Sequence, residues 1–248
     1  MNNKKIDLFK DNELKIYGKR ERTPEECKSP SDILTPVNDK LIKTIKTSED
    51  VVKHVIENFG DYDSQNHISN ALNSNEEFKA LRTKVPSKTP KELSNYQKKY
   101  ASNDNKIKDE ADKKIKEIGT LLPKEQELFH GGKLIDTKKD NELTLSSPLS
   151  TTFDPVIANN EAIHKGKAYD EEELNINIIT NKSSKVKCFP YRHKGTSFGH
   201  EKEVLISSGA KLTIKEKKKI SETTVYKYEN GKNVEKVVPV YITKIDMS

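Results

Sequence analysis

The sequence predicts an α+β fold in which a helical N-terminal half is followed by a strand-rich C-terminal half. Apolar residues between positions 41 and 122 recur at the three- and four-residue spacing of amphipathic helices. Beyond Pro123 the chain changes to short runs rich in valine, isoleucine and threonine, which are typical of strands. We therefore expect three segments: a polar, loosely ordered N-terminal arm (1–40), a helical lobe (41–122) and a strand-rich core (123–248).

Three segments of the lobe carry helix signals. Residues 47–60 begin with two candidate N-cap side chains followed by acidic residues, and they end on a glycine. Residues 88–102 contain a capping box with proline at the first helical position. Residues 104–122 place four apolar side chains on one helix face: Ile107, Ala111, Ile115 and Ile118.

The core contains eight candidate strands and one helix. The helix is expected over 154–166, with Asp154 as its cap and Pro155 at its start. The strands are expected within 126–132, 143–152, 174–180, 184–189, 203–209, 211–216, 223–231 and 237–245.

The composition narrows the classes of partner. The 248 residues carry a formal net charge of +6, and the positive charge is almost all lysine. A nucleic-acid surface favours arginine with interleaved aromatic residues, so we expect no nucleic-acid partner. The two cysteines, Cys27 and Cys188, lack the spacing of a zinc site, and we expect no metal.

Targeting signals are also missing from the sequence as given. The first fifteen residues lack the apolar stretch of a signal peptide, and no run is long enough for a membrane helix. We expect a soluble protein made in the cytoplasm, without a membrane span. If it is exported into a host cell, the route is a specialised secretion system.

A pair of glutamates opens one of the candidate strands. Glu201 and Glu203 stand two residues apart before the apolar run 204–206. Residues two apart in a strand point to the same face, so the two carboxylates repel each other. Both carboxylates are therefore expected to face the same cleft.

Two further motifs precede this pair. Ser150, Thr151 and Thr152 end a candidate strand directly before the capped helix. Further upstream, the strand candidate at 126–132 runs through His130 into Gly131. Strand-plus-glycine, then Ser-Thr-Thr, then Glu-x-Glu resembles the order of motifs in the ADP-ribosyltransferase family of bacterial toxins, phage enzymes and vertebrate ectoenzymes.

The resemblance covers residues 90–248 and implies both a fold and an activity. The implied fold is a mixed split β core with the helical lobe packed over it, which makes 123–248 the catalytic core. The implied substrate is NAD, held in the cleft between the sheets without a metal. Family members break the bond between nicotinamide and ribose and pass ADP-ribose to an acceptor.

The resemblance also implies roles for the acidic pair. Glu203 stabilises the positive charge that develops on the ribose in the transition state. Glu201 faces the acceptor, and a glutamate at this position accompanies arginine acceptors, whose proton it accepts. Phe198 stands where the family often has an exposed aromatic residue for acceptor recognition.

The remaining motif residues are expected at NAD. Ser150 is expected to brace Glu203 and to position the nicotinamide ribose, because a hydroxyl donates to a carboxylate without adding charge. Thr151 and Thr152 are expected to support the strand and the pocket wall. Phe153 is expected either near the nicotinamide or packed under the sheet.

The first motif departs from the toxin pattern. The toxin branch has an arginine before the glycine, which grips the NAD phosphates, whereas this chain has His130. A histidine there is similar to the poly-ADP-ribose polymerase branch, in which it bonds the adenine ribose. We expect His130 and Gly131 at NAD, with Lys133, Arg82 and His193 as other candidate cations for the phosphates.

Three functions follow from the resemblance. The leading one is mono-ADP-ribosylation of a protein arginine, by a bacterial effector or toxin or by a phage or viral enzyme acting on a target protein. The second is an NAD glycohydrolase, with water as the acceptor. The third is an inactive member that binds a partner protein through the same cleft.

Overall fold

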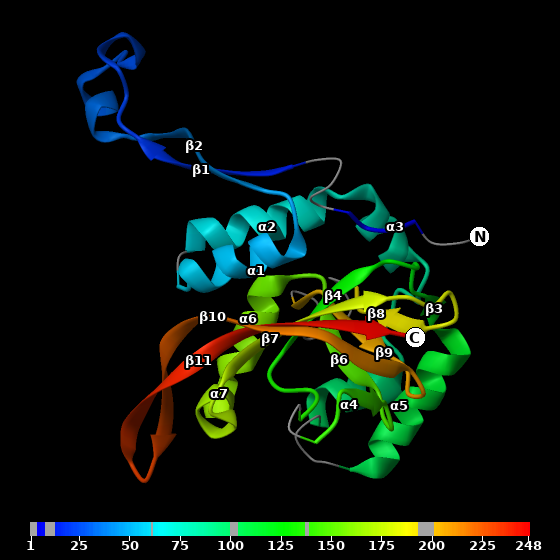
Figure 1. Ribbon diagram of the computed structural model, residues 1–248. Helices are drawn as coiled ribbons and strands as arrows, with labels where there is room; N and C mark the ends of the chain where they lie inside the picture. Colours follow the sequence, from blue (N-terminus) through cyan, green and yellow to red (C-terminus); the bar gives the residue numbers. More distant parts are fainter. Residues whose placement is uncertain (1–3, 8–12, 61, 100–103, 137–138, 193–200) are drawn as a thin grey trace.

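The computed structural model describes residues 4–7, 13–60, 62–99, 104–136, 139–192 and 201–248 (Figure 1). Its centre is a nine-stranded mixed sheet, with helices on both sides of it. The α+β class expected from the sequence is therefore confirmed.

The nine strands follow one another in the order β3-β8-β9-β6-β4-β7-β11-β10-β5. Neighbours are antiparallel except β7 and β11, which run parallel. The strands are β3 (Thr120–Leu121), β4 (Glu127–Gly131), β5 (Glu142–Thr144), β6 (Leu149–Thr152), β7 (Leu174–Asn181), β8 (Lys187–Pro190), β9 (Glu203–Ile206), β10 (Lys211–Glu229) and β11 (Lys232–Met247).

The sheet is split near its middle. Strands β4 and β6 are neighbours, yet they share a single registered pair, Phe129 with Thr152. On either side of this junction the ladders are longer, with five pairs between β4 and β7 and four between β6 and β9. The split lies between the strand of His130 and the strand of Ser150.

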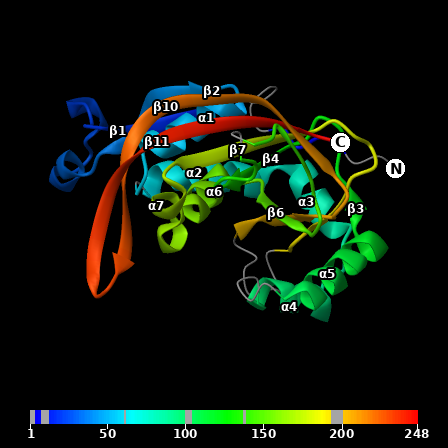
Figure 2. The same ribbon diagram turned by 60° about the horizontal axis from the view of Figure 1, so that its bottom comes forward.

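Strand β10 joins two candidate strands of the sequence into one. It pairs with β11 along nearly its whole length, with bulges between Ile214 and Glu216 and between Lys219 and Ser221. The two strands form a long hairpin that extends away from the rest of the sheet (Figures 1 and 2).

The helical lobe divides into two groups with separate cores. Helices α1 (Ser48–Glu57), α2 (Tyr62–Ser74) and α3 (Glu76–Thr83) contribute buried side chains to the main core over the sheet. Helices α4 (Lys91–Lys99) and α5 (Asn105–Ile118) form a second core with strands β8 and β9. Figure 2 shows this second group apart from the first.

Several expected helix ends are confirmed. Thr47 accepts a hydrogen bond from the backbone nitrogen of Asp50 and so caps α1. The expected face of α5 is buried at Ala111 and Ile115, and Asp104, which the sequence analysis did not single out, caps the start of this helix. In the strand-rich half, Asp154 caps α6 (Pro155–Ile163), which is followed by the short helix α7 (Lys167–Glu171).

The N-terminal arm is more regular than its sequence predicts. Strands β1 (Leu14–Arg20) and β2 (Val37–Ile45) form an antiparallel hairpin that projects from the molecule, with 3-10 turns at Pro24–Glu26 and Pro30–Leu34 (Figure 1). A paired hairpin thus stands where a loosely ordered arm was expected, and its strand residues Ile16 and Ile45 are buried in the main core. The Arg20 guanidinium binds both Glu26 and Asp39 across the hairpin.

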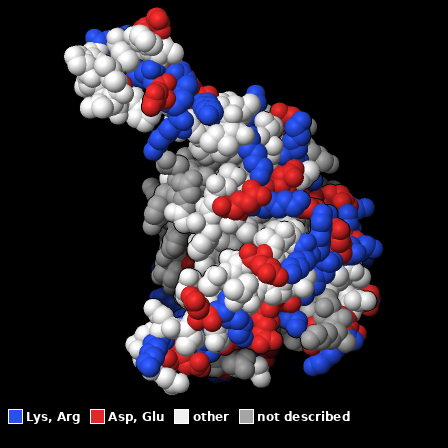
Figure 3. All heavy atoms as spheres, turned by 60° about the vertical axis from the view of Figure 1, so that its left-hand side comes forward, with Lys and Arg blue, Asp and Glu red and all other residues white. Residues whose placement is uncertain are grey.

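Charges of both signs are present on the face shown in Figure 3, with uncharged surface between them. Lysine and arginine side chains alternate with acidic ones from the arm to the β10–β11 hairpin, without a single positive stripe on this face. Among the described helices, none has the length and apolar character needed to cross a membrane. No cluster of His, Cys, Asp and Glu in the described ranges is arranged to hold a metal ion.

Candidate active site

Strands β6 and β9 bring the second and third motifs together. Their antiparallel register sets Thr152 opposite Glu203, with Ser150 diagonal to Glu203 on the same face. The Ser150 hydroxyl donates a hydrogen bond to Glu203 Oε1 over 2.7 Å. The pairing between β6 and β9 thus makes a contact between residues 53 positions apart.

The other oxygen of Glu203 is bound from the helical lobe. Gln97 Nε2, on α4, donates to Glu203 Oε2 over 2.8 Å. The motif order gave no sign of this residue. A local signal did exist, since Gln97 follows buried Leu93 by one helical turn and so lies on the buried side of α4.

Burial dominates the electrostatics of Glu203. The residue is 8 % exposed, and removal from water raises the pKa of its carboxyl group. The hydrogen bonds from Gln97 and Ser150 lower this pKa, whereas the charge of Glu161 raises it. Both donors are neutral, so they hold the carboxylate without cancelling its charge.

Glu201 lies close enough to Glu203 for their charges to interact. Burial raises the pKa of the Glu201 carboxyl group to about 7, and the charges of Glu203 and Glu161 add to the effect. Glu161 is an exposed residue of α6 that the motif analysis did not single out. The charges of three glutamates therefore influence one another at this end of β9.

The imidazole of His130 bridges the split in the sheet. Its Nδ1 atom lies 2.8 Å from the carbonyl oxygen of Ser150. A carbonyl oxygen only accepts, so Nδ1 carries the hydrogen and donates it. Burial and the charge of Lys167 lower the pKa of His130 to about 4. At neutral pH the ring is therefore uncharged, and Nε2 is left as an acceptor.

A lysine supplies the positive charge beside this motif. Lys167, at the start of α7, donates from Nζ to the carbonyl oxygen of Gly131 over 2.7 Å. Gly132 has a φ of 101°, and a Cβ there would collide with the Lys167 side chain. A Cβ on Gly131 would collide with the backbone of α6 at Ala158. The absence of a side chain thus lets α6 pack closely at Gly131 and lets the Lys167 side chain lie beside Gly132.

The other candidate cations are held elsewhere or lie outside the described residues. Lys133 Nζ pairs with Asp136 at 3.2 Å. The Arg82 guanidinium lies over the Phe78 ring and donates from Nε to the carbonyl oxygen of Tyr191. His193 and the acceptor candidate Phe198 fall in the segment 193–200, outside the described residues.

The remaining residues of the segment 150–153 have structural contacts: the two threonines bind backbone carbonyl groups, and the phenylalanine is buried. Thr151 Oγ1 donates to the carbonyl oxygen of Val204, and Thr152 Oγ1 donates to that of Glu201. Phe153 is 3 % exposed and meets Phe78 edge to face, with ring centroids 5.2 Å apart. The structure thus packs Phe153 into the core under the sheet.

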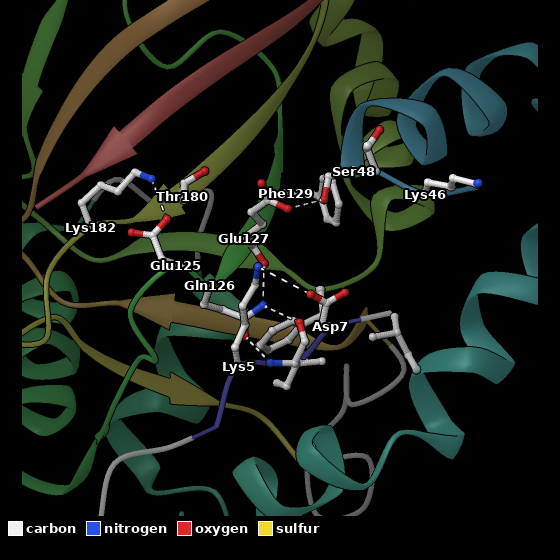
Figure 4. A pocket seen from close by; sticks show the side chains of 14 residues that line it. Lys5, Asp7, Lys46, Ser48, Glu125, Gln126, Glu127, Phe129, Thr180 and Lys182 are labelled. Atoms are coloured by element: carbon white, nitrogen blue, oxygen red, sulfur yellow. Dashed lines mark hydrogen bonds and ion pairs between the residues drawn. The ribbon is translucent and has the colours of Figure 1, made fainter. Parts of the chain in front are cut away.

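A pocket of about 310 Å³ lies apart from the glutamate pair. Figure 4 shows it between residues 5–7, the start of α1 and strand β4, with Phe129 on its wall. Gln126 binds the backbone of Ile6 there through both its side-chain oxygen and its side-chain nitrogen. His130, Ser150 and Glu203 do not line this pocket, which is a space beneath the N-terminal segment.

Neither a protein-family model nor a curated protein matches the sequence. Among solved structures, the chain is similar to the C3 exoenzyme of Clostridium limosum, with 14% identity, a TM-score of 0.43, and coverage of 68% of this chain and 90% of that one. It is also similar to the ADP-ribosyltransferase Vis in complex with agmatine, with 12% identity, a TM-score of 0.43, and coverage of 83% and 88%.

A third similar structure is the ADP-ribosylating toxin BECa of C. perfringens with NADH. The identity is 13% and the TM-score 0.39, and the match covers 69% of this chain. The chain spans less than half the length of two of these structures. It covers 46% of BECa and 45% of the enzymatic component C2-I of the C2 toxin from Clostridium botulinum.

Proposed function

We propose that the protein is a mono-ADP-ribosyltransferase that cleaves NAD and transfers ADP-ribose to an arginine of a target protein. The observation that carries the proposal is the buried carboxylate of Glu203, held by Ser150 on one oxygen and by Gln97 on the other. The motif order supports the same reaction. The target belongs to a host cell if the protein is an exported effector or toxin.

The geometry suits a dissociative cleavage of NAD. The bond between the ribose C1′ and the nicotinamide nitrogen breaks, and its electron pair leaves with nicotinamide. The ribose then carries an oxocarbenium-like positive charge, which a fixed carboxylate stabilises. Glu203 binds two neutral donors, so the positive ribose supplies the opposite charge that favours its ionised form.

Glu201 is suited to activate a guanidinium. An arginine nitrogen that attacks C1′ must lose a proton, and a carboxylate beside it accepts that proton. A pKa of about 7 is well matched to such a base near neutral pH. Glu161 adds negative charge at the same end of β9 and favours a cationic acceptor.

The first motif provides neutral and charged contacts for the rest of NAD. His130 Nε2 is an acceptor for a ribose hydroxyl, because the ring is uncharged at neutral pH. Lys167 brings positive charge to Gly131, next to His130, which stands where the toxin branch has its phosphate-gripping arginine. We propose that His130 binds a hydroxyl and that Lys167 attracts the phosphates. No metal takes part in the proposed reaction.

An NAD glycohydrolase is the second candidate. Water needs less activation than a guanidinium, so Glu203, Ser150 and Gln97 suffice for hydrolysis without Glu201. A host-cell lysate incubated with NAD labelled in the adenylate moiety separates the candidates. Labelled protein supports the transferase, and free ADP-ribose with nicotinamide supports the glycohydrolase. If neither product forms, both activities are contradicted, and the inactive binding module remains.

A further inference from the structure

The residue between the two glutamates is a buried lysine. The Lys202 side chain is 6 % exposed and points away from the face that carries Glu203. Its Nζ atom lies 2.8 Å from Asp154 Oδ2, whose side chain is 3 % exposed. A charged lysine is rarely buried unless it is paired, so this ion pair requires an explanation.

The two partners of Lys202 belong to two helices. Asp154 caps α6, where Oδ1 accepts from the backbone nitrogen of Val156 over 3.1 Å. Ser69 Oγ, on α2, lies 2.7 Å from Lys202 Nζ. The ammonium group is therefore anchored to the start of one helix and the middle of another.

The backbone of Lys202 is in an unusual conformation. Its φ is +50°, in the left-handed region that non-glycine residues seldom adopt. Strand β9 begins only at the next residue, Glu203, so Glu201 lies outside the strand. Thr152 Oγ1 accepts from the backbone nitrogen of Asp154 and donates to the carbonyl oxygen of Glu201. The same two partners, Thr152 and Asp154, thus hold the turn on both sides.

We propose that Lys202 is a positioning residue whose ion pair with Asp154 holds this left-handed turn and so sets where the Glu201 carboxyl group stands relative to Glu203. The inference rests on the proposed function, because it assigns Lys202 to the acceptor half of the reaction. Lys202 does not touch the reacting atoms. Loss of the pair lets the backbone at 202 relax, which moves Glu201 and leaves Glu203 in its strand.

The test uses paired substitutions, because Lys202→Met alone leaves Asp154 buried without a partner. In Lys202→Met/Asp154→Asn no unpaired charge remains, and asparagine is still a good N-cap. Lys202→Gly/Asp154→Asn also lacks the pair, but glycine adopts a positive φ at no steric cost. A matched control is Lys217→Met/Glu173→Gln, which removes an ion pair with a distance of 2.7 Å between Nζ and Oε2 and changes neither Glu201 nor Glu203.

Two activities are measured for each variant: nicotinamide release in buffer and ADP-ribose transfer to agmatine, a small guanidine. In Lys202→Met/Asp154→Asn we expect the ratio of transfer to hydrolysis to fall about 10-fold or more, because small misplacements of a reacting group are costly. The glycine variant should recover much of the ratio, and the Lys217 control should retain it. An unchanged ratio in the methionine variant, or an equal loss in the control, overturns the proposal.

A second readout does not depend on activity. Titration of the Glu201 carboxyl carbon by NMR should give a midpoint near 7 in the parent, where burial, Glu203 and Glu161 raise the pKa. In the methionine variant the midpoint should move toward the ordinary glutamate value, and in the glycine variant it should return. If the parent cleaves no NAD, the proposed function fails, and this titration still decides the role of Lys202. The same midpoint in the parent and in all variants overturns the positioning role of Lys202.

Discussion

His130 and Ser150 are joined across the split in the sheet by a hydrogen bond of 2.8 Å, from the imidazole Nδ1 to the carbonyl oxygen. The backbone ladder between β4 and β6 has its only registered pair at Phe129 and Thr152. The imidazole thus satisfies a carbonyl group that the ladder leaves without a strand partner on this side. One nitrogen of His130 serves the fold, and we propose that the other binds a ligand.

The two nitrogens of His130 can be separated by substitution. Asparagine places an N–H near the position of Nδ1 but has nothing in the place of Nε2. We expect His130→Asn to unfold at a temperature close to that of the parent and to bind NAD more weakly. His130→Leu leaves the Ser150 carbonyl unsatisfied and should lower the free energy of unfolding by about 1–3 kcal/mol. Thermal unfolding and NAD titration calorimetry measure the two effects. Equal destabilisation by both variants contradicts this division.

The low pKa of His130 makes stability depend on pH. The folded pKa is about 4, below the ordinary histidine pKa of 6.5 that applies to the unfolded chain. Between these values the unfolded state binds more protons, so the free energy of unfolding decreases as the pH falls from 6.5 to 4. The raised pKa of Glu201 acts in the opposite direction between 4.5 and 7. The difference between parent and His130→Asn isolates the histidine part, which we expect to be at most about 3 kcal/mol. A flat difference contradicts the prediction.

Glu203 is predicted to carry both cleavage and transfer. Glu203→Gln keeps the shape of the side chain and removes the charge that opposes the oxocarbenium ion. We expect nicotinamide release and transfer to fall together by about 100-fold or more. The matched variant Glu173→Gln changes a glutamate that pairs with Lys217 and belongs to none of the three motifs, and it should retain activity. Undiminished NAD cleavage by a folded Glu203→Gln protein removes the basis of the proposed function.

Lys167 is predicted to contribute to NAD affinity through its charge. Lys167→Met keeps the length of the side chain that fills the space beside Gly132. We expect weaker NAD binding and a shallower dependence of that binding on salt, because one cation near the phosphates is lost. Lys133→Met is the comparison, since Lys133 is paired with Asp136. Calorimetry at two ionic strengths distinguishes them, and an equal change in both variants contradicts the assignment.

The sequence predicted the elements whose signals are local. Asp154 before a proline predicted the start of α6, and the spacing from Ile107 to Ile118 predicted the buried face of α5. Ser150 and Glu203 were placed at one site only through their motifs, since strand periodicity does not reveal which strands pair. The structure supplies that pairing.

The residues that the sequence did not reveal depend on distant contacts. Gln97 reaches Glu203 across 106 positions of the chain, from a helix that packs on β8 and β9. Lys167 is one lysine among many in the sequence. Its position beside Gly131 and Gly132 is seen only in the structure. In the β1–β2 hairpin, Arg20 binds Glu26 and Asp39, and such a charge arrangement leaves no apolar period in the sequence.

Glu201 is predicted to control transfer and its dependence on pH. A general base must be ionised, and burial with the charges of Glu203 and Glu161 raises the Glu201 pKa to about 7. The rate of transfer to agmatine should therefore rise as the pH increases through 7 and level off above it. NAD hydrolysis, which needs Glu203 but not this base, should change less over the same range.

Glu201→Gln should abolish transfer, remove this rise with pH and leave slow hydrolysis. Nicotinamide release and agmatine labelling, followed side by side from pH 5.5 to 8.5, measure both rates. If hydrolysis and transfer fall together in a folded Glu201→Gln protein, the two glutamates do not divide the reaction, and the arginine acceptor loses its main support.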